Sequence, residues 1–230
     1  MNEDLHEIQA GILKNLLFAN GSNFSFLNTQ KLDNNHFTFH IKRLLEIGLV
    51  EKKDDKYFLT TKGKVYAGKL DTDSLKVEKS GKVGVSLMGV RGVGKSKEYL
   101  IQQRLKEPFY GWWGGISGKV RFGHTTEETA KRELEEETGL HGTPVFIGIK
   151  HTIKGRTPND IILDNYFFRY LFKDLEGELR STREGKNYWV KEKAFKALPN
   201  KFHDMDEIFE QVKNERFAHY EEEFYRIENI

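Results

Sequence analysis

The sequence predicts a chain of mixed α and β structure, divided into a small N-terminal domain and a larger C-terminal domain. Apolar residues recur at helical spacing through the early part of the chain, a polar stretch at residues 71–82 interrupts them, and strand-like apolar runs follow. We therefore expect one domain at residues 1–72, a linker at 73–82 and a second domain at 83–230.

The amino-acid composition excludes several classes of protein. A hydrophobic share of 37%, with 17 Phe and 9 Tyr, is enough to pack two cores. The absence of Cys excludes disulfides, thiolate metal sites and cysteine nucleophiles. A net charge of +2 gives no general reason to expect nucleic acid or membrane binding. Because the first residues are acidic and no run of about 18 apolar residues occurs, we expect a cytoplasmic protein without a membrane partner.

The N-terminal pattern is helical and then becomes a short hairpin. Gly48 ends the third helix, and Asp54 and Asp55 form the turn between two short strands. This order of helices and strands resembles the winged helix-turn-helix family over about the first 70 residues. The resemblance includes the stretch HIKRLLEIGLVEKKDDKYFLTTKGK. The expected elements are helices at 5–17, 25–32 and 34–48, strands at 49–53 and 57–60, and a helix at 62–70.

The resemblance implies that the third helix could enter the major groove of DNA. Residues 1–80 contain 12 Lys plus Arg and 11 Asp plus Glu, and a net charge of +1 is weak for a protein that must displace counterions. Dimerisation or docking of a partner therefore stays open as the alternative, and a homodimer is one form of it. The DNA-binding candidates are Asn35, His36, Thr38, Lys42 and Arg43, with His40 as a further polar group on this helix.

The second domain begins with strands and then has one well-delimited helix. We expect strands at 83–90 and 98–103, followed by a glycine-rich segment at 111–120. Thr125 or Thr126 can cap the helix, and Gly139 stands where a C-terminal glycine ends one.

Three carboxylates share one face of this helix. Glu133, Glu136 and Glu137 are spaced i, i+3 and i+4, while Ala130 and Leu134 can face a core. Such a run is usually a solvated acidic surface, and like charges at this spacing cost a few tenths of a kcal/mol each. A hard divalent cation such as Mg²⁺, which prefers oxygen ligands, would offset that cost.

The surrounding segment favours the metal site over the solvated surface. In GKVRFGHTTEETAKRELEEETGL, Gly118 and residues 132–140 are in register with a known pattern. The segment resembles the Nudix box, which has a glycine, five residues, a glutamate, seven residues, and then Arg-Glu-apolar-any-Glu-Glu-any-Gly-apolar. The resemblance implies a Nudix α/β/α sandwich with a mixed sheet over about residues 82–215. Its later elements would be strands at 144–151 and 165–172, a closing strand and turn at 187–199, and a helix at 204–217.

One position departs from the box. His124 stands where the family has its first glutamate, which supports the loop and helix, whereas the later glutamates bind metal. An imidazole cannot replace a carboxylate partner for Arg132, so loop order, rate or metal affinity could suffer. A direct chemical role for His124 is the less favoured alternative.

By this resemblance the protein is a Mg²⁺- or Mn²⁺-dependent hydrolase that cleaves the pyrophosphate of a nucleoside diphosphate linked to another group. The alternative is a DNA-binding transcriptional regulator whose Nudix domain senses a nucleotide-derived ligand. The expected metal ligands and catalytic groups are Glu133, Glu136 and Glu137, supported by Arg132 and by Glu184, with Glu178 as the second choice for the distant acid. The expected substrate-binding residues are Gly118, Lys119, Arg104 and Trp113.

A competing motif lies at residues 89–96. GVRGVGKS satisfies the P-loop pattern, but a P-loop needs a helix that opens at Lys95 and a later metal-binding Asp on a parallel strand. Because residues 98–103 are more typical of a strand, we expect a glycine-rich hairpin loop.

Overall fold

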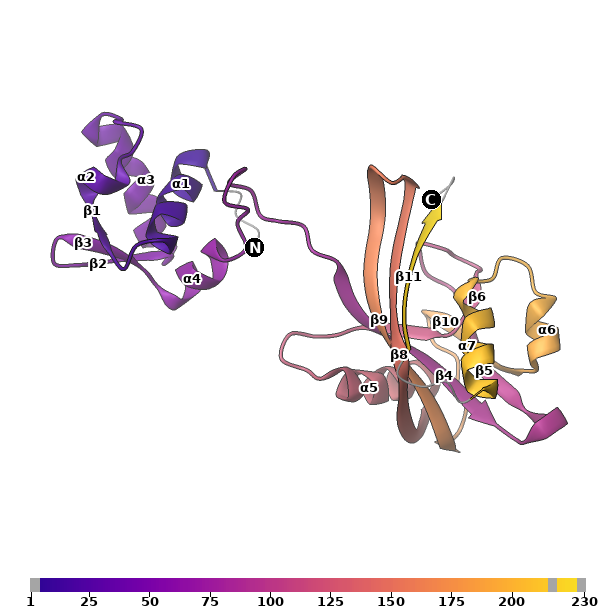
Figure 1. Cartoon of the computed structure of the whole chain (residues 1–230). Helices are drawn as coiled ribbons and strands as arrows, with labels where there is room; N and C mark the ends of the chain where they lie inside the picture. The colour runs from indigo at the N-terminus through magenta and orange to yellow at the C-terminus, as the bar shows by residue number, and fades with distance from the viewer. Residues whose placement is uncertain (1–4, 215–218, 227–230) are drawn as a thin grey trace. The chain divides into compact units, whose positions relative to one another are not determined.

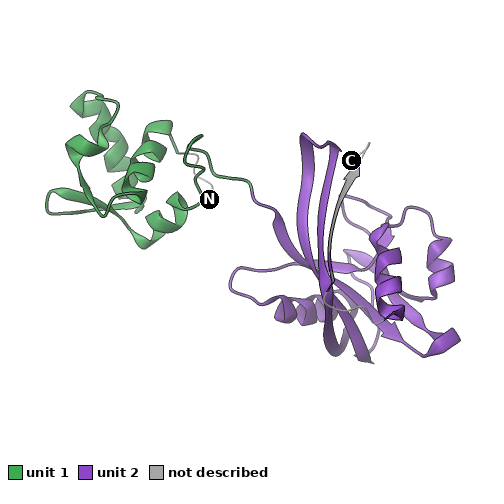
Figure 2. Ribbon diagram, viewed as in Figure 1, with its two compact units in different colours: residues 1–79 green, residues 80–230 purple. Residues whose placement is uncertain are grey.

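The structure is a computed structural model that describes residues 5–214 and 219–226. The chain folds into two compact units, residues 1–79 and 80–230 (Figures 1 and 2). Across the described ranges, no helix has the length and apolar character needed to cross a membrane.

The first unit places helices against a small antiparallel sheet. β3 lies in the middle of this sheet, between β1 and β2. The elements are α1 (Glu7–Leu17), β1 (Ser22–Asn23), α2 (Phe24–Leu27), α3 (Asn34–Glu46), β2 (Val50–Lys53), β3 (Lys56–Leu59) and α4 (Thr61–Ala67).

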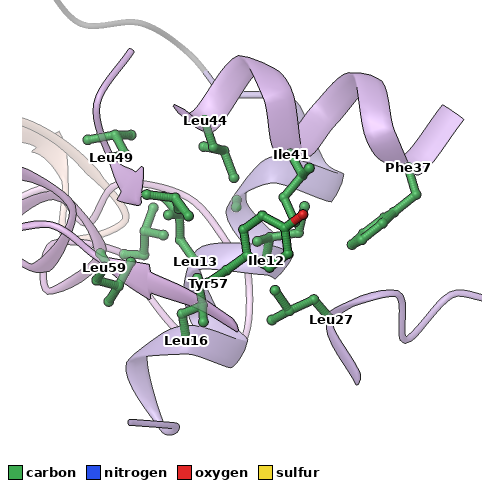
Figure 3. Close-up of a cluster of buried hydrophobic side chains, with 14 residues drawn as sticks. Ile12, Leu13, Leu16, Leu27, Phe37, Ile41, Leu44, Leu49, Tyr57 and Leu59 are labelled. Carbon is green, nitrogen blue, oxygen red and sulfur yellow. The ribbon is translucent and has the colours of Figure 1, made fainter. Parts of the chain in front are cut away.

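Helix α3 forms where the sequence predicts it. Asp33 caps its N-terminus by accepting hydrogen bonds from the backbone N–H groups of Asn35 and His36. Phe37, Ile41 and Leu44 lie on one face and are buried against α1 and the hairpin, as Figure 3 shows.

The second predicted helix of this unit is shorter than expected. It ends at Leu27, not at residue 32, because the Asn28 side chain bonds both backbone groups of Leu32 and closes a loop instead of another helical turn. The last helix also ends early, at Ala67. Strand β1 was not expected, since two polar residues carry no strand pattern.

The second unit is built on one mixed sheet. Its path is β10-β5-β4-β9-β8-β11, with β6 paired to β5 and β7 to β4. Strand β9 runs parallel to β4, and β11 runs parallel to β8. The strands are β4 (Lys82–Arg91), β5 (Glu98–Arg104), β6 (Trp113–Gly114), β7 (Ile116–Lys119), β8 (Leu140–Thr157), β9 (Asp160–Gly177), β10 (Gly185–Val190) and β11 (His219–Arg226).

Helices cover both faces of this sheet, which confirms the predicted Nudix-type α/β/α architecture. Helix α5 (Thr126–Thr138) packs on one face, while α6 (Glu192–Lys196) and α7 (Asp204–Lys213) contribute to the core on the other. Neighbouring strand residues alternate between these cores. Leu87 and Leu100 lie with α5, whereas Met88 and Ile101 lie with α7.

Helix α5 has the limits that the sequence predicts. Thr125 and Glu128 form a reciprocal capping box, and Gly139 ends the helix in the left-handed conformation at φ 75°. Ala130 and Leu134 are fully buried on its inner face. Glu133 and Glu137 lie beside this inner face and are partly buried, whereas Glu135 and Glu136 are exposed.

Several elements of this unit differ from expectation. Strands β8 and β9 each have 18 residues and extend well beyond the apolar cores predicted for them. The glycine-rich segment breaks at Gly115 into β6 and β7. Strand β11 was not predicted, and the predicted extension of the last helix to residue 217 enters residues outside the described ranges.

The P-loop-like segment is a hairpin connection, as expected. It joins β4 to β5, which pair antiparallel, and contains only the three-residue 3-10 helix η1 (Gly94–Ser96). Because no α-helix opens at Lys95, the phosphate-binding geometry of a P-loop is missing from this segment.

Candidate active site on helix α5

Arg132 holds two of the three predicted metal-binding carboxylates. Its guanidinium lies 2.7 Å from Glu133 Oε1 and 2.7 Å from Glu136 Oε2, and it also donates to the Lys119 carbonyl at 3.5 Å. Arg121 reaches the other Glu136 oxygen at 3.8 Å. Side-chain exposure separates the two acids, since Glu133 is 12% exposed and Glu136 is 52% exposed.

Gly118 on β7 lies directly against Glu133. A Cβ at Gly118 would overlap the carboxyl group of Glu133. The glycine thus allows the strand backbone to approach the helix, and the glutamate fills the space that a larger side chain would take.

Glu137 is held by a separate hydrogen-bond network. Its Oε2 accepts from Gln102 Nε2 at 3.1 Å and from Thr182 Oγ1 at 3.2 Å. Asn187 Nδ2 donates to the Glu137 carbonyl at 2.6 Å, and Asn187 Oδ1 accepts from Gln102 at 3.2 Å. The Glu137 carboxylate is therefore positioned by β5, β10 and the loop before β10.

Burial and neighbouring charges shift the pKa of Glu133. Burial raises the pKa of Glu133 despite the opposing effect of Arg132, and Glu136 and Glu137 raise it further. Burial alone would lower the pKa of Arg132, but Glu133 and Glu136 raise it. Glu133 therefore loses its proton less readily than an ordinary exposed glutamate.

Arg104 is the last residue of β5 and pairs with Gly185, which follows Glu184. Burial lowers the pKa of Arg104, while Glu184 and Glu137 act in the opposite direction. Its Nε is buried without a hydrogen-bond partner among the described residues. Glu184 accepts from Lys106 Nζ at 2.7 Å, and this bond is the main reason that the pKa of Glu184 is lowered.

The remaining predicted site residues, Lys119, Trp113 and Glu178, lie in environments that differ from one another. Lys119 is exposed at the end of β7. The Trp113 ring packs on Tyr188 with centroids 5.4 Å apart and borders the core under α7. Glu178, the second choice for the distant acid, is exposed on the loop that follows β9.

His124 is exposed in the loop before α5. Its backbone N–H donates to the Arg121 carbonyl at 3.0 Å, so a turn holds it there. Arg132 Nε is buried and has no hydrogen-bond partner among the described residues.

The donor set suits a hard divalent cation. Glu133, Glu136 and Glu137 offer only carboxylate oxygens, which Mg²⁺ and Mn²⁺ prefer. In the present arrangement, no three His, Asp or Glu side chains within residues 5–214 and 219–226 form a group that could hold a metal ion. In this arrangement Arg132 pairs with Glu133 and Glu136, so a cation would have to replace it as their partner.

The N-terminal candidates lie on α3. Asn35, His36 and Lys42 are exposed, Thr38 is partly buried, and Arg43 pairs with Glu46 at 3.7 Å. His40 is buried at 3% exposure and contacts His36. The candidates therefore do not form one uniform surface.

Three residues around Glu137 were missed by reasoning from the sequence. Gln102 shares a face of β5 with Arg104, and this strand alternation is the signal that could have identified it. Thr182 and Asn187 lie 45 and 50 residues from Glu137, and no local pattern connects them to it.

Comparison with known proteins shows the family of the second unit. Residues 82–212 match the NUDIX domain family. The "Oxidized purine nucleoside triphosphate hydrolase" of Danio rerio is 38% identical over 81 residues, which cover 34% of this chain and 49% of the relative. The chain spans about a third to a half of the length of the curated relatives it matches.

Two solved structures share the fold of the second unit. The MutT mutator protein from Bacillus halodurans is 27% identical with a TM-score of 0.52, and the match covers 63% of this chain and 90% of that one. The NUDIX domain of Shewanella oneidensis NrtR, solved with ADP ribose, is 17% identical with a TM-score of 0.52 and covers 68% and 99%. Because the family match covers more than half of its length, the chain belongs to the NUDIX domain family.

Proposed function

We propose that this protein is a metal-dependent hydrolase that cleaves the pyrophosphate bond of a nucleoside diphosphate linked to another group. The carboxylate face of α5, with Gly118 against Glu133, is the observation that carries the proposal. Its position between a glycine-containing strand and a glycine helix stop matches the Nudix box.

The residues near this carboxylate face have the following roles in the proposed hydrolysis. Glu133, Glu136 and Glu137 would hold Mg²⁺ or Mn²⁺, which neutralises charge that develops on phosphate oxygens. Glu133, which is 12% exposed against 52% for Glu136, would be either a metal ligand or the base that accepts a proton from water. Gln102 and Thr182 hold Glu137 in place, and Asn187 holds the end of the helix.

Arg104 and Lys119 are the cationic groups proposed for the substrate phosphates. The unpartnered Arg104 Nε supports this part, because an anion would supply the acceptor that the buried guanidinium lacks. Glu184 is the proposed distant acid, since it lies near enough to affect the pKa of Arg104. We assign Trp113 mainly to packing on Tyr188, with any substrate contact limited to its partly exposed edge.

Nucleoside triphosphates are the first substrate class to examine. The Danio rerio relative, whose name describes hydrolysis of oxidized purine nucleoside triphosphates, supports this choice through its 38% identity over 81 residues. The aromatic residues before the box, Phe109 and Trp112, pack with Phe202 and leave part of their surface exposed.

The experiment is a substrate panel with and without Mg²⁺ or Mn²⁺. It contains ordinary and oxidized purine nucleoside triphosphates, ADP-ribose, NADH, dinucleoside polyphosphates and sugar nucleotides. Glu136→Gln should abolish metal-dependent turnover while keeping the fold, whereas Glu135→Gln, an exposed neighbour on the same helix, should keep turnover. Equal turnover by wild type and Glu136→Gln would refute the assignment of the metal ligands.

A second candidate function concerns the first unit, which we propose to be a winged helix that binds DNA. The order α1-β1-α2-α3-β2-β3 supports it, and so do the exposed lysines Lys42, Lys52, Lys53 and Lys56 on α3 and the hairpin. In this reading the Nudix domain would sense a nucleotide-derived ligand, and the winged helix would respond.

Binding of genomic DNA fragments at several salt concentrations tests this second function. Joint replacement of Lys42 and Arg43 by Ala should weaken binding and reduce the slope of log K against log salt by about 1 to 2. Lys69→Ala, on the segment after α4, is the matched control. Absence of binding by the wild type at low salt would remove the DNA-binding proposal and leave docking or dimerisation.

A further inference from the structure

Three histidines meet where the start of α1 contacts α3. His36 and His40 are one turn apart on α3, and their Nε2 atoms lie 3.1 Å from each other. The ring of His6, the N-cap of α1, lies 4.6 Å from the ring of His40, measured between centroids. The cluster belongs to the first unit and takes no part in the proposed hydrolysis.

The buried ring of His40 makes a polar contact with His36. His40 is only 3% exposed, and its Nδ1 is buried without a hydrogen-bond partner among the described residues. Its Nε2 is therefore the ring atom with a polar neighbour. His36 is exposed, so the pair of Nε2 atoms can be reached from solvent on the His36 side.

We propose that His36 and His40 form a two-ligand chelate for a divalent transition metal such as Zn²⁺ through their Nε2 atoms. Zinc–nitrogen bonds of about 2.0 to 2.1 Å at a tetrahedral angle place two nitrogens about 3.3 Å apart, close to the separation in this pair. Two histidines four residues apart on a helix present their rings on one face, which is the spacing that such chelation requires.

The site is an open one. Within the described ranges no group of three His, Asp or Glu side chains could hold a metal ion, so solvent would fill the remaining positions. His6 packs on His40, while its Nδ1 accepts from the Ile8 backbone N–H at 3.2 Å. Metal bound at this pair would occupy the Nε2 of His36 and prevent that atom from contacting DNA.

The alternative is a simple hydrogen bond in which one Nε2–H donates to the other Nε2. The two arrangements differ in whether a proton or a metal ion lies between the nitrogens. This difference can be measured directly, because zinc is diamagnetic and alters the ¹⁵N shift of the imidazole nitrogen that it binds.

The test is a Zn²⁺ titration of the full chain in excess Mg²⁺, followed by calorimetry and by imidazole ¹H–¹⁵N spectra. His36→Ala removes an exposed ring, so the fold should persist, and Zn²⁺ affinity should fall roughly tenfold or more. His141→Ala, an exposed histidine of the other unit, is the control. Glu133→Gln with Glu136→Gln should leave this binding in place, which separates the His36–His40 site from the carboxylates of α5.

Each outcome decides the proposal. Zinc-dependent shifts of Nε2 in both His36 and His40, lost in His36→Ala, support it. Equal affinity in wild type and His36→Ala, absence of Zn²⁺ binding, or an unchanged Nε2 proton between the rings in saturating Zn²⁺ would overturn it.

Discussion

Gly118 leaves the space that the Glu133 carboxyl group occupies, since a Cβ added at Gly118 would overlap that group. The backbone of Gly118 has no left-handed φ, so replacement by Ala acts through this contact and not through backbone strain. The relationship ties the placement of a proposed metal ligand to the lack of a side chain on the neighbouring strand.

Gly118→Ala should therefore reduce metal-dependent turnover while the chain stays folded. Displacement of Glu133 should lower kcat/KM by about 100-fold, at the upper end of the loss usual when the support of a metal ligand is removed. Steady-state kinetics on the best substrate of the panel measure this, and Ser117→Ala, an exposed neighbour on β7, is the control. Similar losses in both variants would show that the strand matters and the contact with Glu133 does not.

His124→Glu should make the metal bind more tightly. A carboxylate at this position would provide an acceptor for the unpartnered Arg132 Nε and draw the guanidinium away from Glu133 and Glu136. The Mg²⁺ concentration for half-maximal turnover should then fall by on the order of tenfold. His124→Gln, which has no charge, should change little, and equal effects of the two substitutions would contradict this account of Arg132.

Glu207→Gln should destabilise the second unit. Glu207 accepts from Lys150 Nζ at 3.0 and 3.1 Å and from Arg169 Nη2 at 3.0 Å, and both cationic side chains are 1% exposed. Loss of this shared negative charge should lower the free energy of unfolding by about 3 kcal/mol, although Asp204 lies 3.8 Å from Arg169 and compensates in part.

Urea denaturation followed by Trp fluorescence measures this effect, because all three Trp residues lie in the second unit. Asp206→Asn, an exposed acid on the same helix, should change the unfolding free energy by less than about 0.5 kcal/mol. If Glu207→Gln and Asp206→Asn unfolded at the same urea concentration, the contacts of Glu207 with Lys150 and Arg169 would have no net stabilising effect.

The first unit should lose stability in mild acid through His40. Burial, then His6 and His36, lower the pKa of His40, so the unfolded chain binds a proton more strongly than the folded one. The neutral His40 side chain therefore makes its full contribution to the stability of the folded state above about pH 6.5. This contribution is lost as the pH falls through the lowered pKa of His40.

Hydrogen exchange of the α1 and α3 amides at several pH values measures this change as free energies of opening. The wild type should lose protection below about pH 6.5, and His40→Gln should show a weaker dependence. His141→Gln should behave as the wild type does. The same slope in His40→Gln and wild type would assign the pH dependence to other groups, of which His6 and His36 are in contact with His40.

The sequence by itself determined the features that depend on short separations. Thr125, Glu128 and Gly139 set the limits of α5, and the helical repeat places Glu133, Glu136 and Glu137 together, because caps and i, i+4 neighbours lie within one or two turns. The same reasoning located α3 through its helical repeat and Gly48, and it identified the segment at residues 89–96 as a hairpin loop.

Only the tertiary structure decided the contacts between distant residues. Glu137 meets Gln102 across 35 residues, and strand register, which no local pattern specifies, brings β5 and β10 to that point. The pairing of β11 with β8 and the contact of His6 with His40 have the same origin. Local propensity acts over a few residues, whereas these contacts follow from which surfaces the packed core brings together.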